Sequence, residues 1–249
     1  MTVPERVVIV IPARFASTRL PGKPLLARTG KPLIQHVVEQ ARRVGSAAVV
    51  VATDDARIAD AVTAFGGTAV MTSPDCASGS DRVAEVMAGR DEDLVVNLQG
   101  DEPDFDPADI ERLITTMWAD PSLPMGTLAV LADSEDGDRP SAVKVVCDLD
   151  GRALYFSRSR VPHERDPVPG APAPAPVLRH VGIYAFRREA VLAFARLEPT
   201  PLERTEKLEQ LRALEHGWKI AVVRAERAPR GIDTPDDYDE FCRRMAAGS

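Results

Sequence analysis

The sequence is poor in cysteine and has no long apolar run. Its three cysteines, Cys76, Cys147 and Cys242, are an odd number without CxxC spacing, so neither a disulfide framework nor a zinc site is expected. The first apolar run, residues 7–11, is too short for the core of a signal peptide. No stretch approaches the roughly 20 apolar residues that span a membrane. We therefore expect a cytoplasmic protein that does not enter a membrane.

The chain also lacks an excess of basic residues. It has 31 Lys and Arg against 38 Asp and Glu, a formal net charge of −7. This balance argues against non-specific binding to nucleic acid or to anionic membranes. An apolar content of 44% supports a proper core, and 249 residues suffice for one α/β domain.

What the chain does have is a buried strand that runs directly into a basic loop. Residues 7–11 are five consecutive apolar, β-branched side chains, which predict a parallel strand covered on both faces. The loop after it carries cations, hydroxyls and a Pro-Gly pair: Arg14, Ser17, Thr18, Arg19, Pro21, Gly22 and Lys23. Ligands bind at this edge of open α/β sheets, and Arg and Lys bond strongly to phosphate. The loop therefore predicts a polyanion site, the alternative being solvated surface charges.

The spacing in this loop excludes two common nucleotide motifs, the Walker loop and the GxGxxG fingerprint. Instead, PARFASTRLPGKPL resembles the signature loop of sugar nucleotidyltransferases, and in this form that of the 3-deoxy-D-manno-octulosonate (Kdo) cytidylyltransferases. The resemblance covers residues 7–239 and is weakest over the proline-rich segment 161–176. It implies that CTP and Kdo give CMP-Kdo and diphosphate, which activates Kdo for lipopolysaccharide biosynthesis.

Several alternatives to this activity remain at the sequence level. The acidic sugar could be 8-amino-Kdo, sialic acid or pseudaminic acid, or the substrate could be a hexose 1-phosphate. A non-catalytic nucleotide-binding homologue is a different class. A metal-dependent glycosyltransferase would need a DxD pair, and Asp104 and Asp106 lie beyond Pro103, past the end of the strand.

Strand and helix patterns alternate up to about residue 118. This alternation predicts parallel βαβ units in a doubly wound, mostly parallel α/β sheet, as the resemblance to nucleotide-diphospho-sugar transferases also implies. Ser80 is expected to cap the helix that contains Val83 and Val86.

Strand and helix patterns no longer alternate in the second half of the chain. Strand patterns at 126–131, 143–147 and 152–157 follow one another without helices, and residues 148–151 resemble a hairpin turn. We expect antiparallel additions to the sheet: a single domain, 1–249, with 126–186 as an antiparallel sub-lobe carrying the loop 161–176. The remaining expected elements are a strand at 181–186, a helix through 196, a single helix at 202–216, a strand at 220–224 and a final helix after Pro235.

Two aspartates are candidate ligands for Mg²⁺. Asp101 follows the buried strand 94–97 at the ligand edge of the sheet, where a carboxylate can hold this oxygen-preferring ion. The surrounding VVNLQGDEP matches the family, and the resemblance implies that Gln99 contacts the sugar and Asp101 binds the metal. Asp233 could simply help to cap the last helix, while its GIDTP stretch is similar to the family's GVDTP and implies a second metal ligand. Because Asp101 and Asp233 are far apart in sequence, only the tertiary structure can bring their carboxylates together.

The resemblance also implies a set of CTP-binding residues in the first loop and the third helix: Arg14, Ser17, Lys23 and Arg82. Of these, Arg14 and Lys23 would act with Asp101 in catalysis. Arg82 could equally be an ordinary charge in a first helical turn. The chain departs from the family at Cys76, where histidine is usual, and we assign that position no role.

A pocket for an acidic, polyhydroxylated sugar is implied by the stretches YFSR, RHVGIY and LEQL. Its residues would be Gln99, Arg158, His180, Tyr184, Glu209 and Gln210. An Arg fork matches a carboxylate, and sugar hydroxyls need mixed donors and acceptors. Core packing could also explain His180 and Tyr184, which lie four apart on one strand face. Glu209 and Gln210 could lie on the wet side of a helix. Family membership further implies a homodimer.

Overall fold

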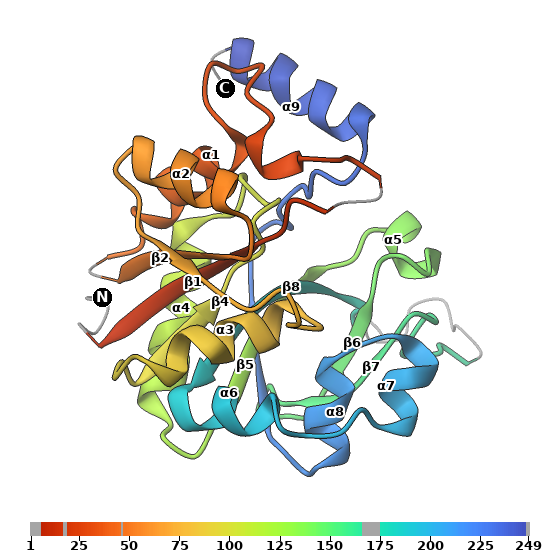
Figure 1. Ribbon diagram of the computed structural model, residues 1–249. Helices are drawn as coiled ribbons and strands as arrows, with labels where there is room; N and C mark the ends of the chain where they lie inside the picture. Colours follow the sequence, from red (N-terminus) through yellow and green to blue (C-terminus); the bar gives the residue numbers. More distant parts are fainter. Residues whose placement is uncertain (1–5, 17–18, 46, 166–174, 248–249) are drawn as a thin grey trace.

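The computed structural model describes residues 6–16, 19–45, 47–165 and 175–247 (Figure 1). Ser17 and the proline-rich residues 166–174 lie outside these ranges. The first half of the chain contains β1 Val7–Ala13, the 3₁₀ helix η1 Lys23–Leu25, α1 Leu33–Ala41, β2 Ala48–Thr53, α2 Ala56–Ala64, β3 Ala69–Met71, α3 Gly79–Ala88, β4 Leu94–Asn97 and α4 Pro107–Ala119. The second half contains β5 Met125–Leu131, α5 Ser134–Asp138, β6 Lys144–Cys147, β7 Ala153–Ser157, β8 Leu178–Arg187, α6 Arg188–Phe194, α7 Pro201–Glu206, α8 Gln210–Glu215, β9 Ile220–Arg224 and α9 Pro235–Ala246. None of the helices in the described ranges is long and apolar enough to cross a membrane.

Nine strands of the described chain form one sheet, with the order β3-β2-β1-β4-β8-β5-β9 and with β6 and β7 attached beside β8. β1 pairs in parallel with β2 and β4, and β2 pairs in parallel with β3. β8 is antiparallel to both β4 and β5, whereas β9 is parallel to β5. The predicted mostly parallel sheet with antiparallel additions is confirmed.

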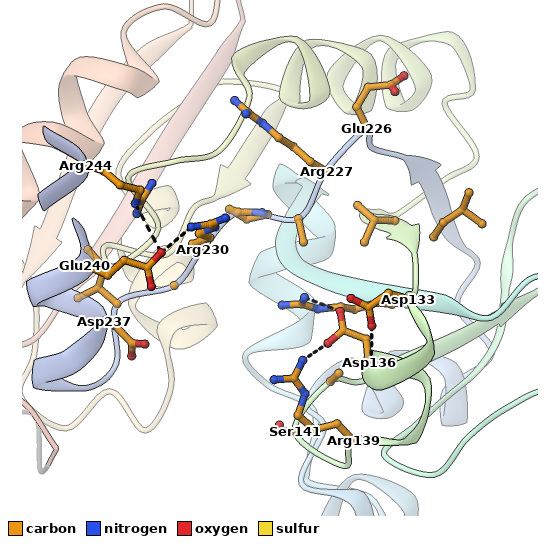
Figure 2. Close-up of a pocket in the computed structure, with 18 residues that line it drawn as sticks. Asp133, Asp136, Arg139, Ser141, Glu226, Arg227, Arg230, Asp237, Glu240 and Arg244 are labelled. Carbon is orange, nitrogen blue, oxygen red and sulfur yellow. Dashed lines mark hydrogen bonds and ion pairs between the residues drawn. The ribbon is translucent and has the colours of Figure 1, made fainter. Parts of the chain in front are cut away.

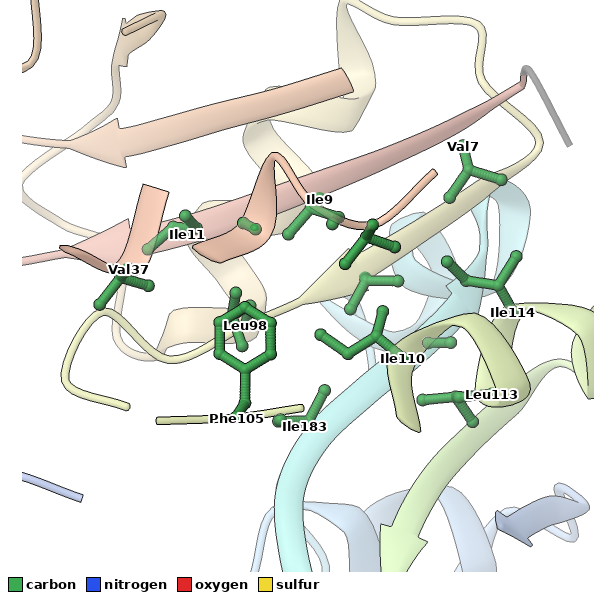
Figure 3. Packing of buried hydrophobic residues seen from close by; sticks show 14 of the residues in the cluster. Val7, Ile9, Ile11, Val37, Leu98, Phe105, Ile110, Leu113, Ile114 and Ile183 are labelled. Atoms are coloured by element: carbon green, nitrogen blue, oxygen red, sulfur yellow. The ribbon is translucent and has the colours of Figure 1, made fainter. Parts of the chain in front are cut away.

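Both faces of this sheet are covered. Alternate residues of β1 point to opposite sides, so Val7, Ile9 and Ile11 join one apolar cluster while Val8 and Val10 join another. Helices α1, α2 and α4 complete the first cluster, part of which Figure 3 shows, and α3, α6 and α8 complete the second. Burying an Ile or Val side chain stabilises the fold by roughly 1.5–3 kcal/mol. The fully buried first strand therefore holds the two helical layers together.

The end of the chain returns to the loop after β1. In a third apolar cluster, Tyr238 and Phe241 of α9 pack with Leu20, Leu33 and Ile232. In Figure 1, α9 accordingly lies over the region of α1 and the first loop, away from the β6–β7 hairpin. This packing brings the segment before α9 to the edge of the sheet where β1 ends.

The predicted antiparallel region is built in two parts. β5 and β8 lie inside the main sheet, and only the β6–β7 hairpin extends from it. The predicted turn at 148–151 is confirmed, because the carboxylate of Asp148 accepts hydrogen bonds from the backbone of Asp150 and Arg152. Gly151 supplies the left-handed φ of +75°. The treatment of 126–186 as a sub-lobe stays a prediction.

One predicted helix is in fact two. The helix expected over 202–216 is wrong, because Lys207 adopts a left-handed conformation with φ 55° and separates α7 from α8. The carboxylate of Glu206, the last residue of α7, accepts hydrogen bonds from the hydroxyl of Ser157 and the backbone N–H of Arg158. These contacts tie the break to the end of β7.

Two smaller predictions are also corrected. A short helix, α5, lies between β5 and β6, where no helix was expected, and Asp133 caps it by accepting from the N–H of Asp136. The cap of α3 is Ser78 rather than Ser80: Ser78 and Asp81 form a reciprocal capping box. Ser80 lies inside the first turn, and its hydroxyl bonds to residues of the site described below.

Candidate functional site

The basic loop after β1 turns back at Gly22. This glycine has a φ of +68°, and a Cβ there would lie 3.2 Å from the ring of Phe15. Only glycine meets both demands without strain. Helix η1 begins directly afterwards, and its first residue, Lys23, has a side chain that is 13% exposed. The turn therefore directs an amine into the protein instead of into solvent.

Lys23 joins the two aspartates that the sequence singled out. Its Nζ donates to Oδ2 of Asp101 at 2.5 Å and to Oδ1 of Asp233 at 3.2 Å. The guanidinium of Arg19 lies 3.1 Å from the same oxygen of Asp233. The N–H of Ile232 donates to the carbonyl of Asp101 at 2.9 Å, which fixes the two loops to each other. The structure therefore brings together the three residues whose meeting the sequence required.

These side chains line a cavity of about 330 Å³, here called the Lys23 cavity. Its wall is formed by the ends of β1 and β4 with the loops that follow them, and by the segment before α9. The lining residues are Pro12, Ala13, Arg14, Ala16, Arg19, Lys23, Pro24, Gln99, Gly100, Asp101 and Asp233. Of the predicted CTP ligands, Arg14 and Lys23 lie here, and Ser17 belongs to the residues that are not described.

The donors in the Lys23 cavity fit a hard cation. Asp101 and Asp233 offer carboxylate oxygens, the ligand type that Mg²⁺ prefers. Within the described ranges, no group of three or more His, Cys, Asp or Glu is arranged to hold a metal. A two-carboxylate set still suits Mg²⁺, which commonly completes its shell with water and substrate phosphates.

Glu102 adds a third carboxyl beside this pair, but one that carries little charge. Its Oε2 is buried and has no hydrogen-bond partner in the described part of the chain. Burial, assisted by the negative charge of Asp101, raises the pKa of Glu102 to about 8. At neutral pH this carboxyl is mostly protonated, so it adds little negative charge to the cavity.

Arg14 is exposed, and its guanidinium donates to the backbone carbonyl of Cys76. Any residue at position 76 would supply that carbonyl, so this contact does not depend on the cysteine side chain. The thiol of Cys76 donates to Glu85 at 3.1 Å, and burial together with Glu85 raises the pKa of Cys76 to about 11. The thiol is therefore neutral, and we assign it no role.

Arg82, a predicted CTP ligand, does not line the Lys23 cavity. Its side chain is fully buried, and its guanidinium donates to the hydroxyl of Thr72 and, at 2.9 Å, to Asp54. These partners follow β3 and β2. Arg82 therefore links α3 to the ends of two strands and has a structural role in the free protein.

The six predicted sugar ligands all line a second cavity of about 580 Å³, here called the His180 cavity. They are Gln99, Arg158, His180, Tyr184, Glu209 and Gln210. Gln99 lines both cavities, so the Lys23 cavity and the His180 cavity adjoin at this residue. The break between α7 and α8 matters here, because it starts α8 at Gln210, which contacts Tyr184 of β8.

Two side chains of β8 are held in defined protonation states. The ring Nε2 of His180 lies 2.9 Å from the hydroxyl of Thr127, and burial lowers the pKa of His180 to about 3. The hydroxyl of Tyr184 donates to Oε1 of Gln210 at 3.1 Å, and burial raises the pKa of Tyr184. At neutral pH the cavity therefore presents a neutral imidazole and a protonated phenol.

The floor of the His180 cavity contains polar groups with spare hydrogen-bonding capacity. Ser80 donates to Oε2 of Glu209 at 2.8 Å, and burial raises the pKa of Glu209. Oε1 of Glu209, Nε2 of Gln210 and Oδ1 of Asn97 are buried, with no partner among the described residues. Such atoms suit a ligand rich in hydroxyl groups. The sequence reading missed Ser80 and Asn97 as lining residues, although a polar residue ending an apolar strand was a usable signal for Asn97.

Arg158 is more occupied than the sequence suggested. Its guanidinium donates to the backbone carbonyls of Glu206 at 2.7 Å, Pro140 at 3.2 Å and Lys207 at 3.3 Å. Three of its five N–H donors are used in this way, which leaves two for a ligand. Arg179, one residue before His180, also lines this cavity and makes an ion pair with Asp136 at 2.8 Å.

A third cavity, of about 550 Å³, adjoins the His180 cavity and is here called the Arg139 cavity (Figure 2). In Figure 2, Asp136 lies on one side of the cavity beside Asp133 and Arg139, and its carboxylate accepts from both Arg139 and Arg179. Arg179, Ser141 and Ala142 line the Arg139 cavity and the His180 cavity alike. The segment around residue 141 is thus a partition between the two.

Comparison with known proteins adds relatives to this geometry. The family described as Cytidylyltransferase matches residues 8–220. A 3-deoxy-manno-octulosonate cytidylyltransferase from Myxococcus xanthus is 51% identical, over 97% of this chain and 97% of its own. One from Geobacter metallireducens is 48% identical, over 97% of this chain and 98% of its own. The solved structure of a CMP:2-keto-3-deoxy-manno-octonic acid synthetase complexed with CTP superposes with a TM-score of 0.92 at 46% identity, covering 98% of this chain and 99% of that one.

Proposed function

The chain belongs to the 3-deoxy-manno-octulosonate cytidylyltransferases, and we propose that it transfers a cytidylyl group from CTP to Kdo with release of diphosphate. The product, CMP-Kdo, is the activated sugar for lipopolysaccharide biosynthesis. One observation carries the proposal: a cavity lined by cations and carboxylates adjoins a cavity lined by hydroxyl-binding groups, and Gln99 belongs to both.

The reaction needs two substrates held side by side. The anomeric oxygen of the sugar attacks the α-phosphorus of CTP, a new P–O bond forms, and the bond to the β-phosphate oxygen breaks as diphosphate leaves. The anomeric hydroxyl gives up its proton to solvent in the process. Since the nucleophile belongs to the sugar, the protein contributes alignment and neutralisation of charge, which are the usual means of catalysis in such transfers.

In this proposal the Lys23 cavity holds the triphosphate. Lys23 and Arg14 would donate to phosphate oxygens, and Lys23 would do so at the negative charge that develops on the leaving diphosphate. In the free protein the Lys23 ammonium balances Asp101 and Asp233. Ser17 remains a proposed CTP ligand in the same loop, and Arg82 a proposed support for the nucleotide side of the site.

We further propose that Asp101 and Asp233 hold Mg²⁺. The all-oxygen donor pair supports this choice of ion. When bound, Mg²⁺ neutralises phosphate charge and helps to orient the triphosphate.

The His180 cavity would hold the sugar. Gln99, His180, Tyr184, Glu209 and Gln210 offer donors and acceptors for its hydroxyl groups. Arg179 adds a cation near Arg158, which suits an acidic sugar even though the Arg158 fork is engaged with backbone carbonyls.

Release of diphosphate tests the proposal. Purified protein with CTP and Mg²⁺ is given Kdo, 8-amino-Kdo, sialic acid, pseudaminic acid or a hexose 1-phosphate, and diphosphate is measured with a coupled assay. We expect the highest kcat/KM with Kdo. Tight CTP binding without diphosphate release from any sugar would instead identify a nucleotide-binding homologue without activity.

We also propose a homodimer in the cytoplasm, where CTP is available. Leu149 in the hairpin turn and Leu154 on β7 are exposed apolar side chains, which supports self-association through the hairpin. Sedimentation of the wild type and of a Leu149→Ser, Leu154→Ser double variant measures this. A monomeric wild type would contradict it.

A further inference from the structure

The first residue of β6 is a lysine with no access to solvent. Lys144 is 0% exposed, and its Nζ donates to the carbonyls of Arg139 at 2.9 Å, Ala142 at 2.6 Å and Arg158 at 2.6 Å. An ammonium group has three N–H donors, and all three are used here. Burying a cation among neutral carbonyls is costly unless every donor is satisfied. The three carbonyls must therefore keep fixed positions around the ammonium. Their hydrogen bonds to the ammonium help to fix those positions.

The three carbonyls belong to two separate segments. Arg139 and Ala142 bracket the turn between α5 and β6, and Arg158 follows the end of β7. The guanidinium of Arg158 donates to Pro140 in the same turn. Lys144 and Arg158 thus cross-link the turn 139–142 to the end of β7 from two directions.

This turn is the partition between two cavities. Ser141 and Ala142 line both the His180 cavity and the Arg139 cavity, and Arg158 lines the former. On the outer side, Arg139 makes an ion pair with Asp136, visible in Figure 2. On the inner side, the Lys144 ammonium stabilises the turn, because it donates hydrogen bonds to the carbonyls at both of its ends.

We propose that Lys144 is a positioning residue that sets the wall of the His180 cavity and thereby the fit of the sugar. The inference deepens the proposed function and rests on it. Without the ammonium, the carbonyls of Arg139 and Ala142 lose their buried donor, and the turn moves outward to find water. The His180 cavity then widens, and Arg158 is no longer held in place. The Lys23 cavity, which is lined by none of these residues, is unchanged.

Steady-state kinetics with separate sugar and nucleotide titrations test this role. In Lys144→Ala we expect the KM for Kdo to rise at least about tenfold and the KM for CTP to change less than twofold. Lys219→Ala, which removes an exposed lysine before β9, is the matched control and should change neither. An equal rise of both KM values, or none, would overturn the proposal.

Chemical rescue separates positioning from a general loss of structure. Ethylammonium can enter the space left in Lys144→Ala and donate to the three carbonyls, so it should restore the KM for Kdo. Tetramethylammonium carries the same charge without N–H groups and should not. Rescue by both ions, or by neither, contradicts the assignment.

A gentler substitution covers the case in which Lys144→Ala does not fold. Lys144→Gln keeps two N–H donors and should show a smaller rise in the KM for Kdo alone. An unchanged KM for Kdo in this variant would overturn the proposal. Inactivity of the wild type with Kdo and CTP would refute the proposed function itself, which keeps the two failures distinct.

Discussion

At the scale of single residues, the site depends on an amine that stands between two carboxylates. Lys23 contacts Asp101 and Asp233 at once, so together with Arg19, which pairs with Asp233, it lowers the repulsion between the two carboxylates. In the proposed function the same ammonium also donates to a phosphate of CTP. This double use explains why a lysine, a compact charge on a flexible stem, suits the position better than an arginine fork.

Replacing Lys23 by alanine should chiefly lower turnover. Loss of one preorganised charge donor typically costs roughly 3–4 kcal/mol of barrier, or about 10²–10³ in kcat. Diphosphate release under saturating CTP and Kdo measures this. Lys31→Ala, which removes an exposed lysine paired with Glu39, is the control. Wild-type kcat in Lys23→Ala would refute the role.

Replacing Asp101 by asparagine should raise the Mg²⁺ concentration needed for half-maximal activity, because a neutral amide binds the ion less tightly than a carboxylate. The measurement is activity against Mg²⁺ at fixed CTP and Kdo, with circular dichroism to verify the fold. Asp60→Asn, on the exposed side of α2, is the control and should behave as wild type. Unchanged Mg²⁺ demand in Asp101→Asn would refute the metal assignment.

At the scale of elements, the break between α7 and α8 shapes the His180 cavity. Glu203 of α7 holds Arg212 of α8 through two hydrogen bonds of 2.9 and 2.6 Å, with both side chains nearly buried. This ion pair clamps two short helices that would be marginal alone. Because Glu209 and Gln210 open α8, the clamp also sets where they lie.

Glu203→Gln should therefore destabilise the protein in a pH-dependent way, by about 1–3 kcal/mol near neutral pH. Burial alone would raise the pKa of Glu203, but its hydrogen bonds to Arg212 and to the N–H of Thr200 lower it below the ordinary value. The ion pair's contribution is present above the pKa of an unfolded Glu, about 4.3, and is lost as pH falls through the lower folded-state value.

Urea unfolding of wild type and Glu203→Gln at several pH values checks this. The difference in unfolding free energy should be largest at pH 6–7 and shrink towards pH 3. Glu198→Gln, at an exposed position, is the control. A difference that does not vary with pH would contradict the ion-pair explanation.

At the scale of the whole molecule, the Lys23 cavity is assembled from opposite ends of the chain. Lys23 comes from the first loop, and Asp233 lies directly before α9. The third apolar cluster, through Leu20, Ile232 and Phe241, holds these ends together. The stability of this cluster and the geometry of the carboxylates should therefore change together.

Two phenylalanine variants test that coupling. Phe241→Ala removes a ring from the third cluster, and Phe194→Ala removes one from the second cluster, on the far side of the sheet. Each should lose about 3–5 kcal/mol of stability. Only Phe241→Ala should also raise the Mg²⁺ concentration for half-maximal activity. Equal Mg²⁺ demand in both would show that the cluster does not position Asp233.

The sequence by itself determined the parts of this protein that depend on local chemistry. An unbroken β-branched run such as residues 7–11 can be satisfied only by burial on both faces, and the Asp148–Gly151 turn follows from side-chain and glycine preferences. The motif residues around Lys23, Asp101 and His180 identified the family before any geometry was known. Strand order, the insertion of β8 between β4 and β5, and the separation of α7 from α8 depend on contacts between distant segments.

Only the tertiary structure decided which side chains are free to act. It brought Asp233 to Lys23, buried Arg82 against Asp54, engaged Arg158 with backbone carbonyls and placed Lys144 beside the wall of the His180 cavity. The physical reason is that exposure and hydrogen-bond occupancy belong to neighbours in space. A residue type states what a side chain can donate or accept, and the fold determines what is left to offer a ligand.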